Sequence, residues 1–235
     1  MSRESYIRGF MKVALDATQY EFANSPTLPL NLAHSGDIIA DRYNQAVDLV
    51  YPFVKKWEKE IVPKGWDKSK WYGKAGYDKV GGKWTIGNGL TTIYDKKLGK
   101  YRKVQKGDTI TQEENDARVK AILRANASKM YKNLEWSRTL SPRALAKLMD
   151  VGYNCGINAL YSKKSPNLNK SMANASWLER EKIVDREIPT YRLSNGIRYP
   201  GLENRRKDSL SYFGGPTDDD MIDYENMYYG ARGFE

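Results

Sequence analysis

The sequence predicts an α+β protein in which a small β-hairpin sheet follows one long helix and precedes a larger helical lobe. Three features of the chain carry this prediction. Apolar residues recur at three- and four-residue steps between positions 37 and 61. Glycines interrupt short strand-like runs between positions 64 and 104, and helix-start signals recur from Thr111 onward.

The first long helix is predicted from an amphipathic pattern. Val47, Val50, Val54 and Trp57 belong to an apolar stripe that starts near Asp37, and Pro52 is expected to start a new turn or to kink the helix. Ahead of it, residues 5–16 have helical spacing and precede a connector rich in Pro and Asn, which indicates a short helix on a linker.

The later elements are predicted from turn and capping residues. Runs such as KWTIG and KKLGKYRKV between glycines are typical of β-hairpins. Thr111 with Glu114, and Ser176 with Glu179, have the spacing of capping boxes, and Ser141 precedes a proline at a first helical position. We therefore expect helices from Thr111, from Ser141, over 177–187 and over 203–213.

Composition limits the chemistry that the chain can perform. Cys155 is the only cysteine and His34 the only histidine, which excludes an intramolecular disulfide, a cysteine metal cluster and any site built on paired histidines. Carboxylates are left to carry any hydrolytic chemistry. The N-terminal residues lack the continuous apolar stretch of a secretory leader, and no run approaches the roughly 18 apolar residues of a membrane span, so we expect synthesis in a cytoplasm.

Charge is distributed unevenly. The net charge is +10, but the segment after Pro216 has six acidic residues against one arginine, which gives it −5 and leaves residues 1–216 at +15. Such a protein is attracted to polyanions, among them nucleic acid, anionic lipid and a bacterial wall. The lysines are scattered and match no nucleic-acid-binding motif, which disfavours the nucleic-acid alternative.

Two carboxylates have the contrasting surroundings that glycoside cleavage needs. Glu58 lies beside the apolar face of the first helix, where burial would raise its pKa, whereas Asp78 lies in a Gly-flanked turn where a carboxylate stays ionised. Aromatic residues crowd the same stretch and suit sugar rings. From composition alone, a structural role for such a pair and for the aromatics remains the more common explanation.

An ordered series of motifs resembles the phage-type lysozymes of glycoside hydrolase family 24. The motifs are FVKKWE, YDKVGGKWTIGNG, GDTITQEE, LMDVGYNCGINAL, SPNLNKSM and YPGLENRR. The resemblance implies a two-lobed lysozyme-like fold and a catalytic set of Glu58, Asp78 and Thr85. It also implies inverting hydrolysis of the β-1,4 bond between N-acetylmuramic acid and N-acetylglucosamine, without a cofactor, with Glu58 as general acid and Asp78, helped by Thr85, activating a water.

The same resemblance suggests further roles and shows some departures. Trp84, Asn154 and Arg205 are candidate substrate-binding residues, although Asn154 can instead be a structural cap and Arg205 can support packing between lobes. The chain has Leu90 and Ser209 where the family commonly has a histidine and an acidic residue. The spacings from Glu58 to Asp78 and from Asp78 to Thr85 are longer than usual.

The chain is longer than the resemblance requires. We expect an extension over 1–46, a catalytic domain over 47–213 and an acidic, aromatic tail over 214–235. The extensions suggest an alternative in which the chain is a structural or adaptor component of a phage virion that keeps a lysozyme-like domain, with residues 1–46 and 214–235 contacting other virion proteins. Peptidoglycan is the expected substrate, reached after holin-type release or from a virion.

Overall fold

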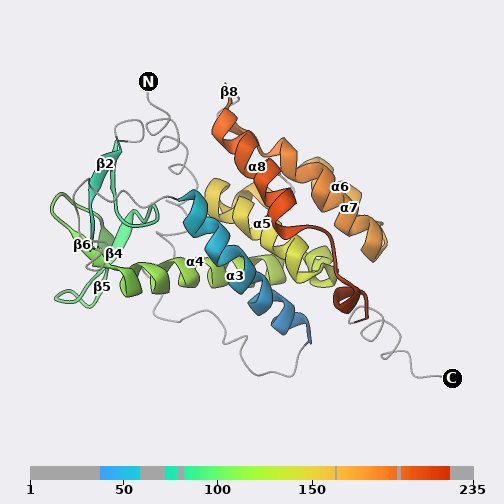
Figure 1. The fold of residues 1–235 in the computed structure, drawn as a ribbon, viewed down its shortest axis with the longest axis horizontal. Helices are drawn as coiled ribbons and strands as arrows, with labels where there is room; N and C mark the ends of the chain where they lie inside the picture. The colour runs from blue at the N-terminus through green and yellow to red at the C-terminus, as the bar shows by residue number, and fades with distance from the viewer. Residues whose placement is uncertain (1–37, 59–71, 79–81, 162, 195–196, 223–235) are drawn as a thin grey trace.

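The computed structural model describes residues 38–58, 72–78, 82–161, 163–194 and 197–222. Within them a small lobe of short antiparallel strands lies beside a larger helical lobe (Figure 1). The predicted helix over 5–16, the linker with His34 and the end of the tail lie outside the described residues. None of the described helices is long and apolar enough to cross a membrane.

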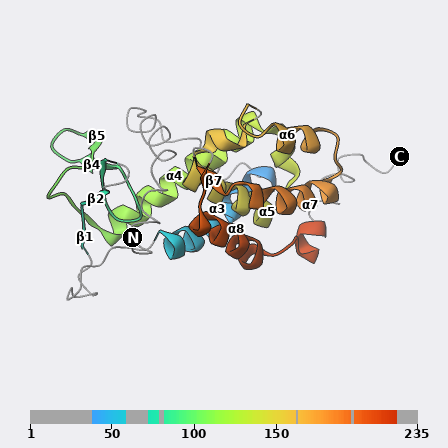
Figure 2. The same ribbon diagram turned by 90° about the horizontal axis from the view of Figure 1, so that it is seen from above.

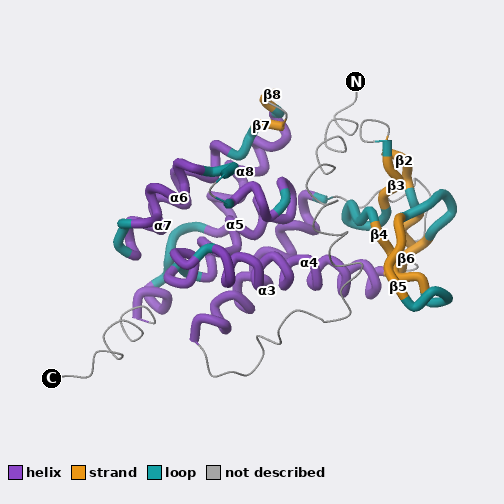
Figure 3. Tube along the Cα trace, turned by 180° about the vertical axis from the view of Figure 1, so that it is seen from behind, coloured by secondary structure: helices purple, strands orange, loops and turns teal. Residues whose placement is uncertain are grey.

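The sheet lobe is built from three pairs of strands. β1 pairs with β6, β2 with β3 and β4 with β5, each pair antiparallel (Figure 3). The alternating glycine and β-prone residues expected over 64–104 therefore form hairpins, within the part of that segment that is described. The strands are β1 (Tyr72–Lys74), β2 (Gly76–Asp78), β3 (Lys83–Thr85), β4 (Thr92–Asp95), β5 (Lys100–Lys103) and β6 (Thr109–Thr111).

The helical lobe is organised around α5, which contacts α3, α4, α7 and α8. Figure 2 shows α5 among these helices when the molecule is viewed from above. Its helices are α3 (Ile38–Trp57), α4 (Gln112–Asn133), α5 (Pro142–Cys155), α6 (Pro166–Ala173), α7 (Trp177–Glu187) and α8 (Pro200–Phe213). Short 3₁₀ turns lie at Glu135–Thr139, Ile157–Leu160 and Ile188–Thr190, and a small pair of strands, β7 (Leu193–Ser194) and β8 (Ile197–Arg198), precedes α8.

Local capping explains where several helices begin. The Thr111–Glu114 and Ser176–Glu179 capping boxes both form, and the Ser141 hydroxyl accepts a hydrogen bond from the N–H of Ala144 ahead of a proline. The helix predicted over 177–187 is confirmed. The last helix begins at Pro200, three residues before the predicted start, because a proline suits the first helical position.

One apolar core joins α3 to the rest of the helical lobe. Val47, Val50 and Val54 of α3 are buried there, as the amphipathic pattern predicts, and Tyr43 and Phe53 are fully buried beside them. α3 continues through Pro52 and across the proposed domain boundary between residues 46 and 47. α4 extends from β6 into the helical lobe and so connects the two lobes (Figure 1).

The tail is described as far as residue 222. The guanidinium of Arg143 donates to the carbonyl of Phe213 at 2.7 Å, which fixes the end of α8. Thr217 and Asp220 then cap a short helical turn, because each accepts a hydrogen bond from the backbone N–H of the other. The first part of the acidic segment thus forms a capped helical turn after α8.

Candidate active site

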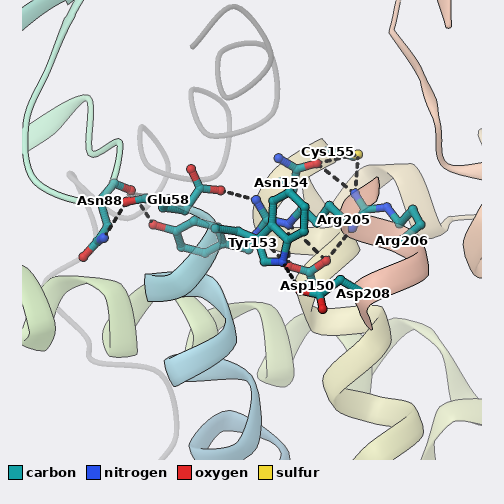
Figure 4. Close-up of polar contacts among 10 residues, drawn as sticks. Glu58, Asn88, Asp150, Tyr153, Asn154, Cys155, Arg205, Arg206 and Asp208 are labelled. Carbon is teal, nitrogen blue, oxygen red and sulfur yellow. Dashed lines mark hydrogen bonds and ion pairs between the residues drawn. The ribbon is translucent and has the colours of Figure 1, made fainter. Parts of the chain in front are cut away.

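Glu58 directly follows the last residue of α3 and is held by backbone and side-chain contacts. Its N–H donates to the carbonyl of Val54 at 2.8 Å, and its own carbonyl accepts from Asn88 Nδ2 at 2.8 Å. Its Oε1 atom accepts a charge-assisted hydrogen bond from Arg205 Nη1 (Figure 4). The residue is 2% exposed, so the carboxyl group has a fixed position in a medium of low polarity.

Burial raises the pKa of the Glu58 carboxyl above its ordinary value of 4.5, and the Arg205 guanidinium opposes this shift. The other oxygen, Oε2, is buried and has no hydrogen-bond partner among the described residues. A buried oxygen without a donor makes the ionised form less favourable. This carboxyl group therefore keeps its proton to a higher pH than an exposed glutamate, as a general acid requires.

Behind Glu58 lies a buried network of ionised side chains from α5 and α8. Asp150 accepts hydrogen bonds from Arg205 Nε at 2.9 Å and Nη2 at 2.6 Å, and also from Arg206 Nη1. All four side chains are at most 5% exposed in their ion pairs. Two carboxylates face two guanidinium groups, so the network is charge-balanced when Glu58 is ionised.

Arg206 extends the network to the end of α5. Its Nη2 atom donates to Asn154 Oδ1 at 2.8 Å and contacts Cys155 Sγ at 3.4 Å. Burial of the sulfur raises the pKa of the Cys155 thiol, although the residue as a whole is only half-buried. Asn154 is 3% exposed and Arg205 4%, so both candidate substrate-binding residues lie within the buried network. Their direct contact with substrate stays a prediction.

The turn after β3 locks the sheet lobe onto Glu58. Asn88 donates through its side chain to the Glu58 carbonyl and through its backbone N–H to Asn115 Oδ1 at 2.9 Å. Asn115 returns a hydrogen bond to Asn88 Oδ1, and the Tyr153 hydroxyl donates to the Asn88 carbonyl at 3.0 Å. Asn88 thus connects the end of α3 with α4 and α5 at the point where the lobes meet. Figure 4 shows its contacts with Glu58 and Tyr153.

Gly87 is required for this turn. Its φ is +54°, and a Cβ atom there would lie 2.1 Å from Asn115 Oδ1. We expect Gly87→Ala to lower the free energy of unfolding by about 3 kcal/mol, through left-handed strain and the loss of the Asn115 hydrogen bonds. Denaturant titration measures this loss.

The matched control is Gly99→Ala. Gly99 also has a positive φ, +61°, but a Cβ atom there meets nothing within 4 Å. We expect it to cost about 1 kcal/mol, the backbone strain alone. Equal losses in the two variants would show that the contact with Asn115 is unimportant.

The structure places Asp78 and Thr85 in one hairpin. Gly76 pairs with Thr85, Tyr77 with Trp84 and Asp78 with Lys83. Because successive strand positions alternate between faces, positions 78 and 85 belong to the same face and are diagonal neighbours, on the order of 7 Å apart. The side chain of Asp78 lies outside what the structure describes. The Trp84 ring is half-buried and packs edge-on against Tyr77, with centroids 5.4 Å apart.

The comparisons with known proteins identify the family. The phage lysozyme family model matches residues 70–209, well over half of the chain. The chain belongs to the phage lysozyme family. No curated protein matches it. Among solved structures, the chain is similar to an endolysin from Escherichia coli O157:H7 phage FAHEc1, with 18% identity over 74% of this chain and 94% of that chain, and a TM-score of 0.43.

Membership settles the class of reaction. As a phage lysozyme, the chain is a glycoside hydrolase that degrades peptidoglycan. The resemblance found in the motif series is thereby confirmed. The family match begins after Glu58. The catalytic role proposed for Glu58 is therefore supported by the contacts of this residue and not by the family match. Within the described part of the chain, no three histidine, cysteine or carboxylate side chains gather in a way that could hold a metal ion.

At two positions this phage lysozyme has a residue that differs from the one common in the family, and the structure shows the surroundings of both. Leu90 is fully buried in the core, bridged to Ile86 across the turn. Ser209 is fully buried too, and the neighbouring Asp208 accepts a hydrogen bond from Trp57 Nε1 at 2.6 Å and one from Lys56 Nζ at 2.8 Å. Asp208 therefore ties α8 to the end of α3, next to Glu58.

Reasoning from the sequence missed Asp150. The signal was a lone acidic residue within the apolar run LMDVGYN, since a carboxylate on a buried helix face needs a buried cation as its partner. Asn88, Asn115 and Tyr153 were also missed, and no local pattern marks them, because their contacts join segments distant in sequence.

Proposed function

We propose that this phage lysozyme cleaves the β-1,4 bond between N-acetylmuramic acid and N-acetylglucosamine with inversion of configuration. The observation that carries the proposal is the Glu58 carboxyl group, which is buried, anchored through Oε1 by Arg205, and free of a hydrogen-bond partner at Oε2 among the described residues. One oxygen is fixed, and the other is left for the glycosidic oxygen.

In this mechanism Glu58 donates its proton to the glycosidic oxygen as the bond to the anomeric carbon breaks. A water attacks that carbon from the opposite face of the ring and gives its proton to Asp78, with Thr85 helping to orient the water. The shared hairpin face of positions 78 and 85 supports this division of roles. Arg205 stabilises the carboxylate that forms on Glu58.

The stereochemistry of the first product tests the inverting mechanism. Cleavage of a β-linked substrate with inversion releases the α-anomer of N-acetylmuramic acid at the new reducing end. We expect proton NMR of early digests of a soluble glycan fragment to show the α-anomer before mutarotation. The β-anomer as first product would indicate retention, and N-acetylglucosamine at the new reducing ends would overturn the assigned bond.

The extensions and the route to the wall belong to the same proposal. We infer a catalytic domain over 47–213, with 1–46 and 214–235 as extensions that contact other phage proteins if the enzyme travels in the virion. Purified virus particles can be probed for this chain with an antibody. The chain is present in the particles if it is a virion-borne enzyme or an adaptor that keeps the domain, and absent if it is an endolysin released through a holin. Wall-degrading activity in the same particles distinguishes the enzyme from the adaptor.

A further inference from the structure

The segment from β4 to the start of β6 is strongly basic. Residues 92–108 contain six cationic residues and two acidic ones, a net charge of +4 (6 − 2). Figure 3 shows the β4–β5 hairpin at the outer edge of the sheet lobe, away from α6 and α7. The cationic residues are Lys96, Lys97, Lys100, Arg102, Lys103 and Lys106, and the acidic ones are Asp95 and Asp108.

Both acidic residues are bonded to the one arginine. Arg102 Nε donates to Asp95 at 2.7 Å, and its two terminal nitrogens donate to Asp108 at 2.7 Å each. Asp95 also accepts from the backbone N–H groups of Lys97 and Leu98, at 2.9 and 3.1 Å. The acidic residues therefore fix the shape of the hairpin through Arg102, whose single charge offsets one of the two carboxylates.

Three lysines of this segment, two beside the β4–β5 turn and one in the loop before β6, have no carboxylate partner among the described residues. Lys97, Lys100 and Lys106 are exposed, and none forms an ion pair with a carboxylate in the described ranges. Lys96, by contrast, pairs with Glu114 at 3.0 Å. An anionic ligand that pairs with these lysines therefore competes with no carboxylate among the described residues.

Apolar groups are exposed beside these lysines. Tyr94 is 51% exposed and Leu98 57%. The Tyr94 ring packs edge-on against Tyr101, with centroids 5.3 Å apart, and the Arg118 guanidinium lies 4.0 Å from the centre of the Tyr101 ring. A fixed, exposed ring next to cations suits a ligand with both apolar faces and negative charge, such as a sugar chain with attached acidic peptides.

We propose that the β4–β5 hairpin and the loop that follows it form an accessory surface, which holds peptidoglycan by pairing Lys97, Lys100 and Lys106 with the carboxylates of its stem peptides. This inference rests on the proposed function, because it takes the polymer being cleaved as the occupant. The choice follows from charge complementarity and from the size of the substrate, since a wall polymer extends beyond the bond at Glu58.

Binding of the full-length Glu58→Gln protein to purified walls tests the surface without requiring cleavage. The change Lys97→Gln, Lys100→Gln and Lys106→Gln is expected to weaken co-sedimentation with walls about tenfold at low salt, and less at high salt. The matched control removes the same charge from exposed lysines of the helical lobe, by Lys163→Gln, Lys170→Gln and Lys182→Gln, and is expected to change binding less than threefold.

A second arm identifies the anion. Walls whose carboxyl groups have been converted to neutral amides should bind the hairpin variant and its parent equally. The inference is overturned if the hairpin variant binds native walls as its parent does, if the control variant weakens binding as much, or if the difference persists on amidated walls. Failure of the proposed function would appear separately, as the wrong reducing-end sugar in digests by the wild type.

Discussion

Replacing Glu58 with glutamine is expected to lower the rate of wall degradation by about 10³-fold, within the range for removal of a general acid. The amide has nearly the shape of the acid, so it still reaches Arg205, but it has no proton to give to the leaving oxygen. Loss of turbidity of purified walls, measured at equal protein concentration, gives the rate. Thermal unfolding of the variant shows whether the fold is kept.

Glu181→Gln is the matched control, because Glu181 is also a buried glutamate whose pKa is raised by burial. Its carboxylate accepts from the Ser141 N–H at 2.7 Å and from the Ser141 hydroxyl at 3.0 Å, at the start of α5. We expect this variant to degrade walls nearly as fast as the wild type. Clearing by Glu58→Gln at the rate of Glu181→Gln would remove Glu58 from the catalytic set.

Asp150→Asn is expected to reduce the free energy of unfolding by about 3–5 kcal/mol, the usual cost of breaking a buried ion pair from one side. Arg206 would then lose its carboxylate partner among the described residues, and Arg205 would keep only Glu58, because Asp150 is the partner that the two arginines have in common. Chemical denaturation followed by circular dichroism measures the loss. Activity should fall as well, since Arg205 would no longer be held against Glu58.

An exposed ion pair at the start of α8 provides the comparison. Glu203 accepts hydrogen bonds from Arg198, whose side chain is 60% exposed, and lies 3.4 Å from Lys207. We expect Glu203→Gln to leave the denaturation midpoint almost unchanged, because solvent screens such pairs. If Asp150→Asn were equally harmless, the buried network would not be what holds α5 and α8 together at the site.

Local signals in the sequence predicted much of the fold. Capping residues act within one helical turn, so Thr111 with Glu114 and Ser176 with Glu179 marked helix starts that the structure confirms. The amphipathic pattern likewise predicted the buried face of α3 and placed Glu58 beside it, where half-burial was expected and the structure buries the residue almost fully. These features depend on neighbours that are close in the chain.

The site was less predictable, because it depends on contacts between distant segments. Asp150 meets Arg205 across 55 residues, and Asn88 meets Glu58 across 30. The sequence left two roles open for Arg205, substrate contact and packing between the lobes. Its burial against Asp150 and Glu58 is a property of the fold that no local pattern reveals. The order of the motifs predicted the candidate residues, and the fold shows which side chains surround the described ones.

The pKa of Glu58 is the quantity that tests the central claim most directly. It can be measured by carbon NMR of protein labelled at the glutamate carboxyl groups, with the Glu58 signal assigned by its loss in Glu58→Gln. The structure predicts a pKa above 4.5, because burial outweighs the effect of Arg205. Since the protonated form is lost as pH rises through this value, wall degradation should decline over the same pH range. A pKa at or below 4.5, or full activity at pH values where Glu58 is wholly ionised, would contradict its role as the general acid.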